Sequence, residues 1–461
     1  MLKIDKELLI NQHKKDISFT INKNFSEANI YRLAKQTGFQ KRTRKVPASC
    51  FVNTLLFSEY SQAHTSLPDF TADLSQVYNI DISKEAMHKK FTPEAVNFLK
   101  ALLNNMLSDQ LKSTTVSDLP QHFACIKIKD STKFSLPSTY NNEYVGYGNF
   151  SKSNGLLSLQ YEYDLISGNW LSIELTNGLR NDQRDSKETI DAITKNDLHI
   201  RDLGYVTPTY LSAIVEKQAF FLNRLPAMAG VFNMQMKPLD WKKVDGLLKK
   251  ANTNSMELKV LLYEKNQIPC RLIIERVSDK EYQKRLKKAT SIAKSKGIGI
   301  SVLHKLKLRY NAFVTNVNSS VLPISKIRKT YYLRWQIELI FKTWKSFFEI
   351  NKLKKVKKER MECQLLGKLL WILINWRLFK TCNTHVRKMD AEKGVSILIF
   401  FKRCLKFTTT LRLVFLKRLD VTKWLRNIYL PLIANSLCEA PWNKKNHYHW
   451  LRININNKAL S

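Results

Sequence analysis

The sequence predicts an α/β protein, in which a mixed-sheet core is interrupted by an insertion and preceded by an all-α N-terminal domain. Residues 1–115 carry helix-length apolar patterns, residues from about 120 onward alternate as strands do, and strand-like runs in 226–320 separate two parts of one core. We therefore divide the chain into segments 1–115, 116–225, 226–320, 321–380 and 381–461, the last a basic helical region.

The composition points to a polyanionic partner. The chain has 461 residues with 76 Lys and Arg against 39 Asp and Glu, a formal net charge of +37. Such a charge repels itself unless a polyanion balances it, so nucleic acid is the first candidate and an anionic membrane surface the second. A hydrophobic content of 44% excludes a disordered chain. The membrane surface is the weaker option, because the basic residues are not gathered on one amphipathic helix.

Cysteine usage and hydropathy favour a reducing, aqueous compartment. The seven cysteines are dispersed without a C-x-x-C pair, which argues against a zinc ribbon or a disulfide scaffold. The longest apolar run, 365–379, contains Lys368, Asn375 and Arg377 and is typical of a buried helix, not a membrane span. The first residues lack the apolar stretch of a signal peptide. We therefore expect a cytoplasmic protein that does not insert into a membrane.

The N-terminal segment contains two recognisable helix starts. Ser26 can cap a helix that ends near Gly38, before a basic string at 40–47. Residues 66–91 then predict a helix, a short turn and a second helix capped by Ser83. Three lysines of this second unit would suit a helix-turn-helix placed on DNA, although an ordinary helical hairpin has the same pattern. These lysines are Lys84, Lys89 and Lys90.

Strands and helices alternate from residue 120 to residue 320. Residues 156–178 predict two strands joined by a turn at 167–169. The further strands expected in the core are 122–130, 197–202 and 219–225, with helices at 185–195 and 207–218. The interval that follows predicts strands at 256–265, 270–277 and 311–317 and a basic helix at 280–296.

Two of the core strands end in an aspartate on their apolar face. In 122–130, Asp130 shares the face of Ile126 and Ile128, whereas Lys127 and Lys129 are expected on the outer face. In 197–202, Asp202 shares the face of Leu198 and Ile200, and His199 and Arg201 point away. A carboxylate there needs a cation or a metal because its desolvation is costly, although a single Asp at a strand end is more often a turn or cap residue.

A third acid lies on the predicted helix 331–345. At 100° per residue, Arg334, Glu338 and Lys345 fall within a stripe of about 60° beside Tyr331. This stripe borders the apolar face formed by Leu333, Ile337, Ile340, Phe341 and Trp344. A half-buried acid held by a cation and a phenol belongs there. The alternative is a routine helix salt bridge between Arg334 and Glu338.

Together the three acids offer hard oxygen ligands on separate elements. Such a set suits Mg²⁺ or Mn²⁺ and not zinc. The histidines are not organised to replace them, since none of the nine has a metal-ligand spacing on a helix face.

The chain resembles the DDE transposases of bacterial insertion sequences, specifically the IS-four group with its Tyr-x2-Arg-x3-Glu-x6-Lys (YREK) motif. Tyr331, Arg334, Glu338 and Lys345 match that motif without a gap. KDST at 129–132 looks like the first catalytic Asp, DLGY at 202–205 like the second, and YNAFVTNV at 310–317 like the strand before the Glu helix. The resemblance covers roughly residues 20–380 and does not extend into the C-terminal segment.

This resemblance implies a ribonuclease H-like core with a mainly β insertion between the second Asp and the Glu. It implies an enzyme that binds terminal inverted repeats, cuts at transposon ends and joins the freed 3′ ends to target double-stranded DNA. Some members form a hairpin on the transposon end with help from an aromatic residue of the insertion. Trp241 is the only Trp of the insertion, but its surroundings match no pattern that would assign it this role.

The corresponding mechanistic hypothesis is two-metal phosphoryl transfer. Asp130 bridges two Mg²⁺ ions, for which Mn²⁺ can substitute, while Asp202 and Glu338 each hold one. The resemblance makes Tyr331, Arg334 and Lys345 ligands of DNA phosphate, and charge alone favours the same role. Cleavage of two ends requires two active sites, which predicts a homodimer on DNA.

Two other functions stay open at this point. A catalytically inactive DNA-binding regulator on the same fold would share the charge and the helix-turn-helix pattern. A ribonuclease H-like nuclease that cuts without joining would share the three acids. Three intact acids weigh against the regulator, and the YREK helix and the long insertion weigh against the simple nuclease.

Overall fold

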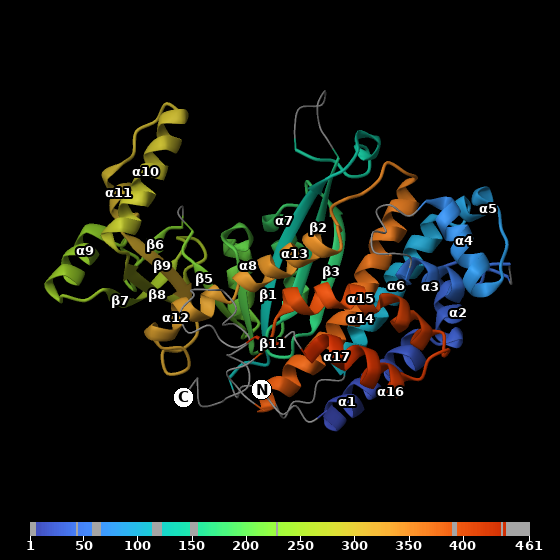
Figure 1. Cartoon of the computed structure of the whole chain (residues 1–461). Coiled ribbons are helices and arrows are strands. Elements are labelled where there is room, and N and C mark those ends of the chain that lie inside the picture. Colours follow the sequence, from blue (N-terminus) through green and yellow to red (C-terminus); the bar gives the residue numbers. More distant parts are fainter. Residues whose placement is uncertain are drawn as a thin grey trace.

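The computed structural model describes most of the chain, and its helices and strands surround one large sheet (Figure 1). The described residues are 6–42, 45–57, 66–112, 122–147, 155–226, 229–389, 394–434 and 437–438. Part of the basic string at 40–47 and most of the predicted C-terminal segment after 434 lie outside them.

Every described element before residue 113 is helical. Ser26 accepts a hydrogen bond from the Asn29 amide and caps α2, and Ser83 does the same for α5 through the Ala86 amide, so both predicted caps are confirmed. The elements are α1 (Lys6–Phe19), a π-helix (Thr20–Asn24), α2 (Glu27–Gln36), α3 (Ala48–Phe57), α4 (Leu67–Tyr78), α5 (Lys84–His88) and α6 (Pro93–Lys112).

The central sheet has nine strands in the order β3-β2-β1-β4-β5-β9-β8-β7-β6. β2 is antiparallel to both β1 and β3, while β1, β4 and β5 run parallel, an arrangement consistent with the ribonuclease H-like core that the resemblance implies. The core strands are β1 (Cys125–Ser135), β2 (Leu156–Asp164), β3 (Trp170–Asn177), β4 (Asp197–Arg201) and β5 (Phe220–Arg224). All five coincide closely with the strands expected from the sequence.

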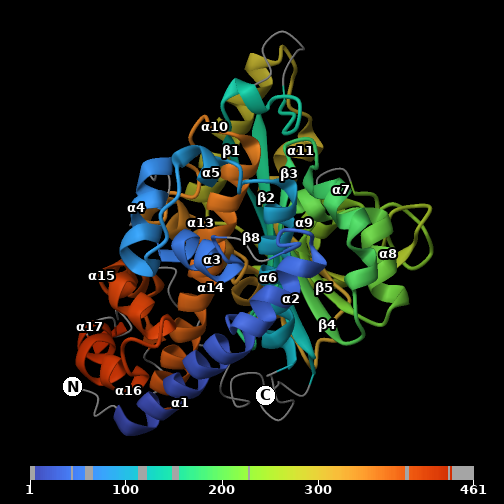
Figure 2. The same ribbon diagram turned by 90° about the vertical axis from the view of Figure 1, so that its right-hand side faces the viewer.

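Helices cover both faces of the core part of the sheet. Figure 2 shows α7 (Asp182–Glu188) and α8 (Pro208–Glu216) on one side and α13 (Trp335–Phe347) with α14 (Lys358–Met389) on the other. The helix expected at 185–195 therefore begins earlier, at Asp182, because Asn181 accepts a hydrogen bond from the Arg184 amide and caps it there. A 3₁₀ turn (Ile190–Ala192) completes the segment.

The long helix α14 joins the N-terminal helices to the sheet. It packs against α6, α3 and α1, and its buried residues belong to the same hydrophobic cluster as theirs. The predicted boundary at residue 380 falls inside this helix, and the apolar run 365–379 is buried in it as expected. In the described part of the chain, none of the helices has both the length and the apolar character needed to cross a membrane.

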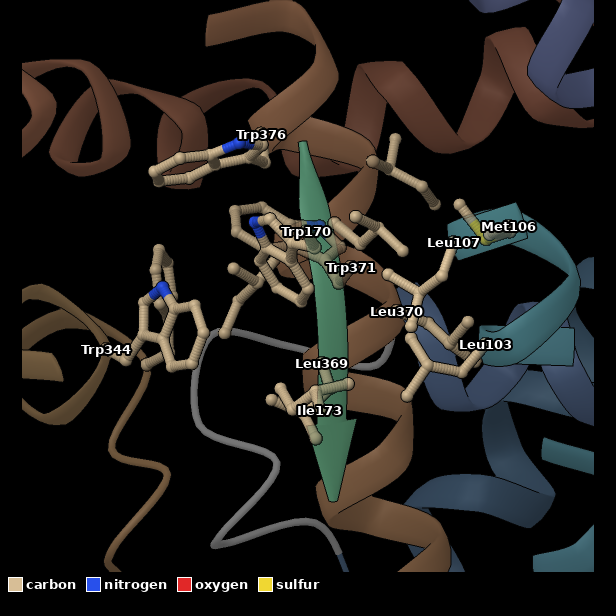
Figure 3. Close-up of a cluster of buried hydrophobic side chains, with 14 of the residues drawn as sticks. Leu103, Met106, Leu107, Trp170, Ile173, Trp344, Leu369, Leu370, Trp371 and Trp376 are labelled. Atoms are coloured by element: carbon tan, nitrogen blue, oxygen red, sulfur yellow. The ribbon is translucent and has the colours of Figure 1, made fainter. Parts of the chain in front are cut away.

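A tryptophan cluster connects the sheet to the helices that carry the site. Trp170 of β3 lies with its ring centroid 5.1 Å from that of Trp344 on α13 and 6.1 Å from that of Trp376 on α14 (Figure 3). All three side chains are at most 2% exposed. Burial of rings this large anchors α13 firmly, since truncating such a residue to Ala typically costs about 3–5 kcal/mol.

The insertion continues the core sheet and is mixed α/β. β9 pairs antiparallel with β5, so the strands after residue 226 extend the same sheet instead of forming a separate one. The expectation of a mainly β insertion is wrong, because helices of 10, 17 and 6 residues accompany the strands. Its elements are β6 (Val231–Phe232), α9 (Trp241–Lys250), β7 (Ser255–Leu262), β8 (Ile268–Arg276), α10 (Asp279–Ser295), α11 (Val302–Lys307) and β9 (Tyr310–Thr315).

The helix predicted at 331–345 is broken once. α12 (Ile324–Tyr332) ends before Leu333, and α13 begins at Trp335. The amides of Leu333, Arg334 and Gln336 bond to carbonyls three residues back, which tightens the helix at this point. The residues predicted to face the core, including Ile337 and Trp344, are nevertheless all buried.

The C-terminal described residues are helical apart from one short strand pair. The elements are α15 (Ile397–Phe415), α16 (Val421–Trp424), a π-helix (Leu425–Tyr429) and α17 (Leu430–Ile433), with β10 (Gly394–Val395) antiparallel to β11 (Leu437–Cys438). α13, α14 and the N-terminal helix α3 all contact α15.

Candidate active site

Asp130 lies where β1 and β4 stop pairing. The last pair of these parallel strands is Lys129 with Arg201, and Asp130 follows directly. Its carboxylate accepts a hydrogen bond from the Ser131 amide at 2.8 Å and one from Arg334 at 3.2 Å. Burial raises the pKa of Asp130 to about 7, and Asp202 and Asp182 add to this rise against the opposing charge of Arg334.

Asp202 follows the last residue of β4 and begins a 3₁₀ turn (Leu203–Tyr205). Because β1 and β4 are parallel neighbours, their ends bring Asp130 and Asp202 to the same edge of the sheet. The side chain of Asp202 is 46% exposed, against 18% for Asp130. The structure thus brings together the two aspartates that the sequence singled out.

Glu338 completes the group from the first turn of α13. Arg334 is the residue that joins the three acids: its guanidinium nitrogens lie 2.7 Å from Glu338, 3.2 Å from Asp130 and 3.7 Å from Asp202. The helix salt bridge considered as an alternative therefore exists, but it is one of three contacts. One cation is shared among three carboxylates from three separate elements.

The donor set fits an oxygen-preferring divalent cation. In the described part of the chain, no three His, Cys, Asp or Glu side chains are already gathered as metal ligands, and here the three acids hold a guanidinium. Carboxylates are the hard ligands that Mg²⁺ and Mn²⁺ accept. Three of them around a single positive charge leave negative charge for a cation to balance.

Tyr331 and Lys345 flank this group on either side of Arg334 and Glu338. Tyr331, on α12, is 4% exposed with its ring centroid 5.4 Å from that of Phe313, and burial raises its pKa to about 12. The hydroxyl is influenced by Arg334 and Asp202, not by Glu338 as the sequence suggested. Lys345 is half-buried, which lowers its pKa, and among the described residues it has no ion pair.

Asp182 is a nearby residue that sequence reasoning missed. It opens α7, and its carboxylate accepts a hydrogen bond from the Ser131 hydroxyl at 3.0 Å. Its other oxygen lies against Gly204, where an added Cβ would come within 2.7 Å. Asp182 therefore joins the residue after Asp130 to the turn after Asp202. An acid in the first turn of a helix is so common that nothing in the sequence distinguished it.

The face of the sheet opposite α13 is a buried polar layer, which corrects one expectation. Lys127 and Lys129 are 9% and 1% exposed and do not lie on an outer face. Lys127 pairs with Asp197 at 2.7 Å and Lys129 with Asp185 at 2.5 Å. Arg201 and His199 are buried as well, Arg201 against Glu162 at 2.9 Å and His199 against the Tyr210 hydroxyl at 2.8 Å. The helices α7 and α8 cover this layer.

The predicted helix-turn-helix is present as α4 and α5, but α5 has only five residues. Lys84 and Lys89 are exposed, whereas the Lys90 ammonium donates to the Val46 carbonyl at 3.2 Å. A single helical turn is short for a helix that reads a groove, so DNA contact by these lysines stays a prediction.

Comparison with known proteins assigns the family. A family model described as "Transposase DDE domain" matches residues 121–374, which contain Asp130, Asp202 and Glu338. The chain is 32% identical over 383 residues to the transposase for insertion sequence element IS231B of Bacillus thuringiensis subsp. berliner, covering 79% of this chain and 80% of the relative. It is 26% identical over 420 residues to that of IS1151 of Clostridium perfringens, covering 86% and 87%. The chain therefore belongs to the DDE transposase family.

Proposed function

We propose that the protein is the transposase of an insertion sequence, which binds the terminal inverted repeats of that element, cuts the DNA there and transfers the freed ends to target DNA. The observation that carries the proposal is the sharing of Arg334 by Asp130, Asp202 and Glu338 at one edge of the sheet. The net charge of +37 supports a double-stranded DNA partner.

Membership of the family implies a divalent metal in general, and we propose two Mg²⁺ ions, with Mn²⁺ as a substitute. Asp130 would contribute to both positions, and Asp202 and Glu338 to one each. Bound there, the ions would activate an attacking water or DNA 3′-hydroxyl and stabilise the leaving oxygen. The raised pKa of Asp130 in the metal-free chain is what the crowding of acids around it produces.

The residues of the YREK motif have separate parts in the proposal. Arg334 neutralises the acids in the free protein and turns to a DNA phosphate when the site is loaded, because a guanidinium and divalent cations compete for the same oxygens. Lys345, half-buried and unpaired among the described residues, meets a phosphate as a point charge. Tyr331 supplies a hydroxyl donor from α12. These contacts would orient the scissile strand without reading its sequence.

We further propose that the active species is a homodimer on DNA, because two transposon ends require two active sites. The protein would act on DNA in the bacterial cytoplasm, in association with the nucleoid. Light scattering with and without end DNA tests this: the DNA complex should contain two protein chains. A complex with one chain per duplex that still cuts both ends would exclude the dimer.

The deciding experiment uses a DNA fragment carrying the sequences that flank the gene. The protein is incubated with this DNA in Mg²⁺, in Mn²⁺ or in EDTA, beside Glu338→Gln and the control Glu264→Gln. Glu264 is an exposed residue in the turn between β7 and β8. We expect nicks at one position near each end with either metal, lost in EDTA and in Glu338→Gln and retained in the control.

The alternative functions make different predictions in the same assay. Binding of the ends without cleavage in either metal would favour the inactive regulator. Metal-dependent cleavage without insertion of the ends into a target plasmid would favour a nuclease that does not join. Cleavage by Glu338→Gln at the rate of the parent protein would overturn the assignment of the metal site.

A further inference from the structure

The helix α10 carries a face made only of lysine side chains. α10 follows β8 and projects with α11 away from the sheet (Figures 1 and 2). At 100° per residue its five lysines fall within a stripe of roughly 120°. All five are exposed, while Tyr282 and Ala293 on the opposite side are buried. We call this stripe the α10 lysine face; it consists of Lys280, Lys284, Lys287, Lys288 and Lys294.

The lysine face has no acid to balance it. The only acids of α10 are Asp279 and Glu281 in its first turn, and Glu281 pairs with Arg285 at 3.1 Å. Lys284 stands four residues from both Lys280 and Lys288, a spacing at which like charges destabilise a helix. Ordinary surface helices mix charges of both signs. A polyanion along this face would remove the repulsion.

The topology places the start of α10 at the same edge of the sheet as the three acids. β9 is antiparallel to both β5 and β8, so β8 runs parallel to β5, β4 and β1. α10 therefore leaves from the strand ends where Asp130 and Asp202 lie. β8 is four strands from β1, which corresponds to about 19 Å at roughly 4.8 Å per strand.

We propose that the α10 lysine face binds the phosphate backbone of the duplex that the active site cuts. Its position corresponds to about six base pairs from the scissile phosphate, at roughly 3.4 Å per base pair. Lysines present point charges without the geometry to read bases, so the contact adds affinity and alignment but no sequence preference. This inference rests on the proposed function for the location of the DNA and adds a second anchoring surface to it.

The test compares two variants that lose equal charge. One is Lys284→Gln/Lys287→Gln/Lys288→Gln. The other is Lys14→Gln/Lys15→Gln/Lys423→Gln, which changes exposed residues of α1 and α16 far from α10 (Figure 1). Affinity for end DNA is measured in Ca²⁺ over a range of salt concentrations. Three lost phosphate contacts should reduce the slope of log K against log salt by about 2.7, whereas the control should lose little.

A footprint locates the contact independently of cutting. Hydroxyl-radical protection about six base pairs from the cleavage position should be lost in the α10 variant and kept in the control. Equal slopes and equal footprints for the two variants would overturn the inference. Because both readouts are binding measurements, a parent protein that never cuts DNA would contradict the proposed function while leaving this inference to be judged on the slope and the footprint alone.

Discussion

The guanidinium of Arg334 lies 2.7 Å from the Glu338 carboxylate and 3.2 Å from that of Asp130, on an element 204 residues away in sequence. Arg334 thus occupies the centre of the acids that the proposal assigns to the metals. A guanidinium carries one positive charge, and the three carboxylates can carry three negative ones. The arrangement makes Arg334 a competitor of any cation that enters the site.

Replacing Arg334 by Gln should strengthen divalent cation binding to the free protein. Removing one unit of positive charge next to the ligands relieves repulsion worth roughly tenfold or more in affinity at the effective dielectric of a protein surface. Calorimetric titration with Mn²⁺ at about pH 8.5, where Asp130 is ionised, measures this. Arg328→Gln, an exposed position on α12, is the matched control. Unchanged or weaker binding in Arg334→Gln would contradict the competition.

Ser131→Ala should raise the Mg²⁺ concentration needed for half-maximal cleavage by about tenfold, which is the usual cost of losing a residue that orients a metal ligand. The Ser131 hydroxyl donates to Asp182, and this bond holds the segment after Asp130 against the turn after Asp202. Asp182→Asn keeps an acceptor for this bond and should show a smaller effect. Ser135→Ala, at the exposed end of β1, serves as the reference. Identical Mg²⁺ curves for all variants would show that the contact has no part in positioning the acids.

Lys129→Met should lower the free energy of unfolding by about 3 kcal/mol or more, because it leaves the buried Asp185 without one of its two cations. Urea denaturation of the parent and the variant measures the loss. The comparison is Lys187→Met, an exposed residue of α7, for which a change within about 0.5 kcal/mol is expected. If Lys129→Met behaved like Lys187→Met, Lys129 would lie on a solvated face after all.

His13 should make the protein less stable in mild acid. It is fully buried beside the Tyr429 ring, and burial together with His385 lowers its pKa to about 3. Between about pH 6.5 and pH 3 the unfolded chain binds a proton at this site and the folded chain does not, so stability falls as the pH drops. The loss at pH 5 is about 2 kcal/mol.

The check on His13 is the slope of stability against pH. In His13→Leu the loss of stability between pH 7 and pH 5 should shrink by that amount, whatever the variant does to stability at pH 7. His88→Asn, at an exposed position of α5, should keep the slope of the parent. A slope that His13→Leu leaves unchanged would mean that other groups cause the acid sensitivity.

Local patterns were enough to predict much of the fold and the position of the three acids. Ser26 and Ser83 cap their helices because a serine side chain satisfies amides of the next turn wherever the rest of the chain lies. Periodicity identified the buried face of α13, and parity along the strands put Asp130 and Asp202 on the same face of the sheet. Each of these properties depends on residues within one or two turns or strands.

The burial of Lys127 and Lys129, the break at Leu333 and Arg334 and the link from Asp182 to Ser131 were decided by the tertiary structure alone. Strand alternation shows which residues share a face but not whether a helix covers it, and α7 and α8 come from later in the chain. The shared Arg334 depends on a contact across 204 residues. Such contacts are set by the packing of whole elements, because the desolvation that determines charge pairing arises only when the covering elements are in place.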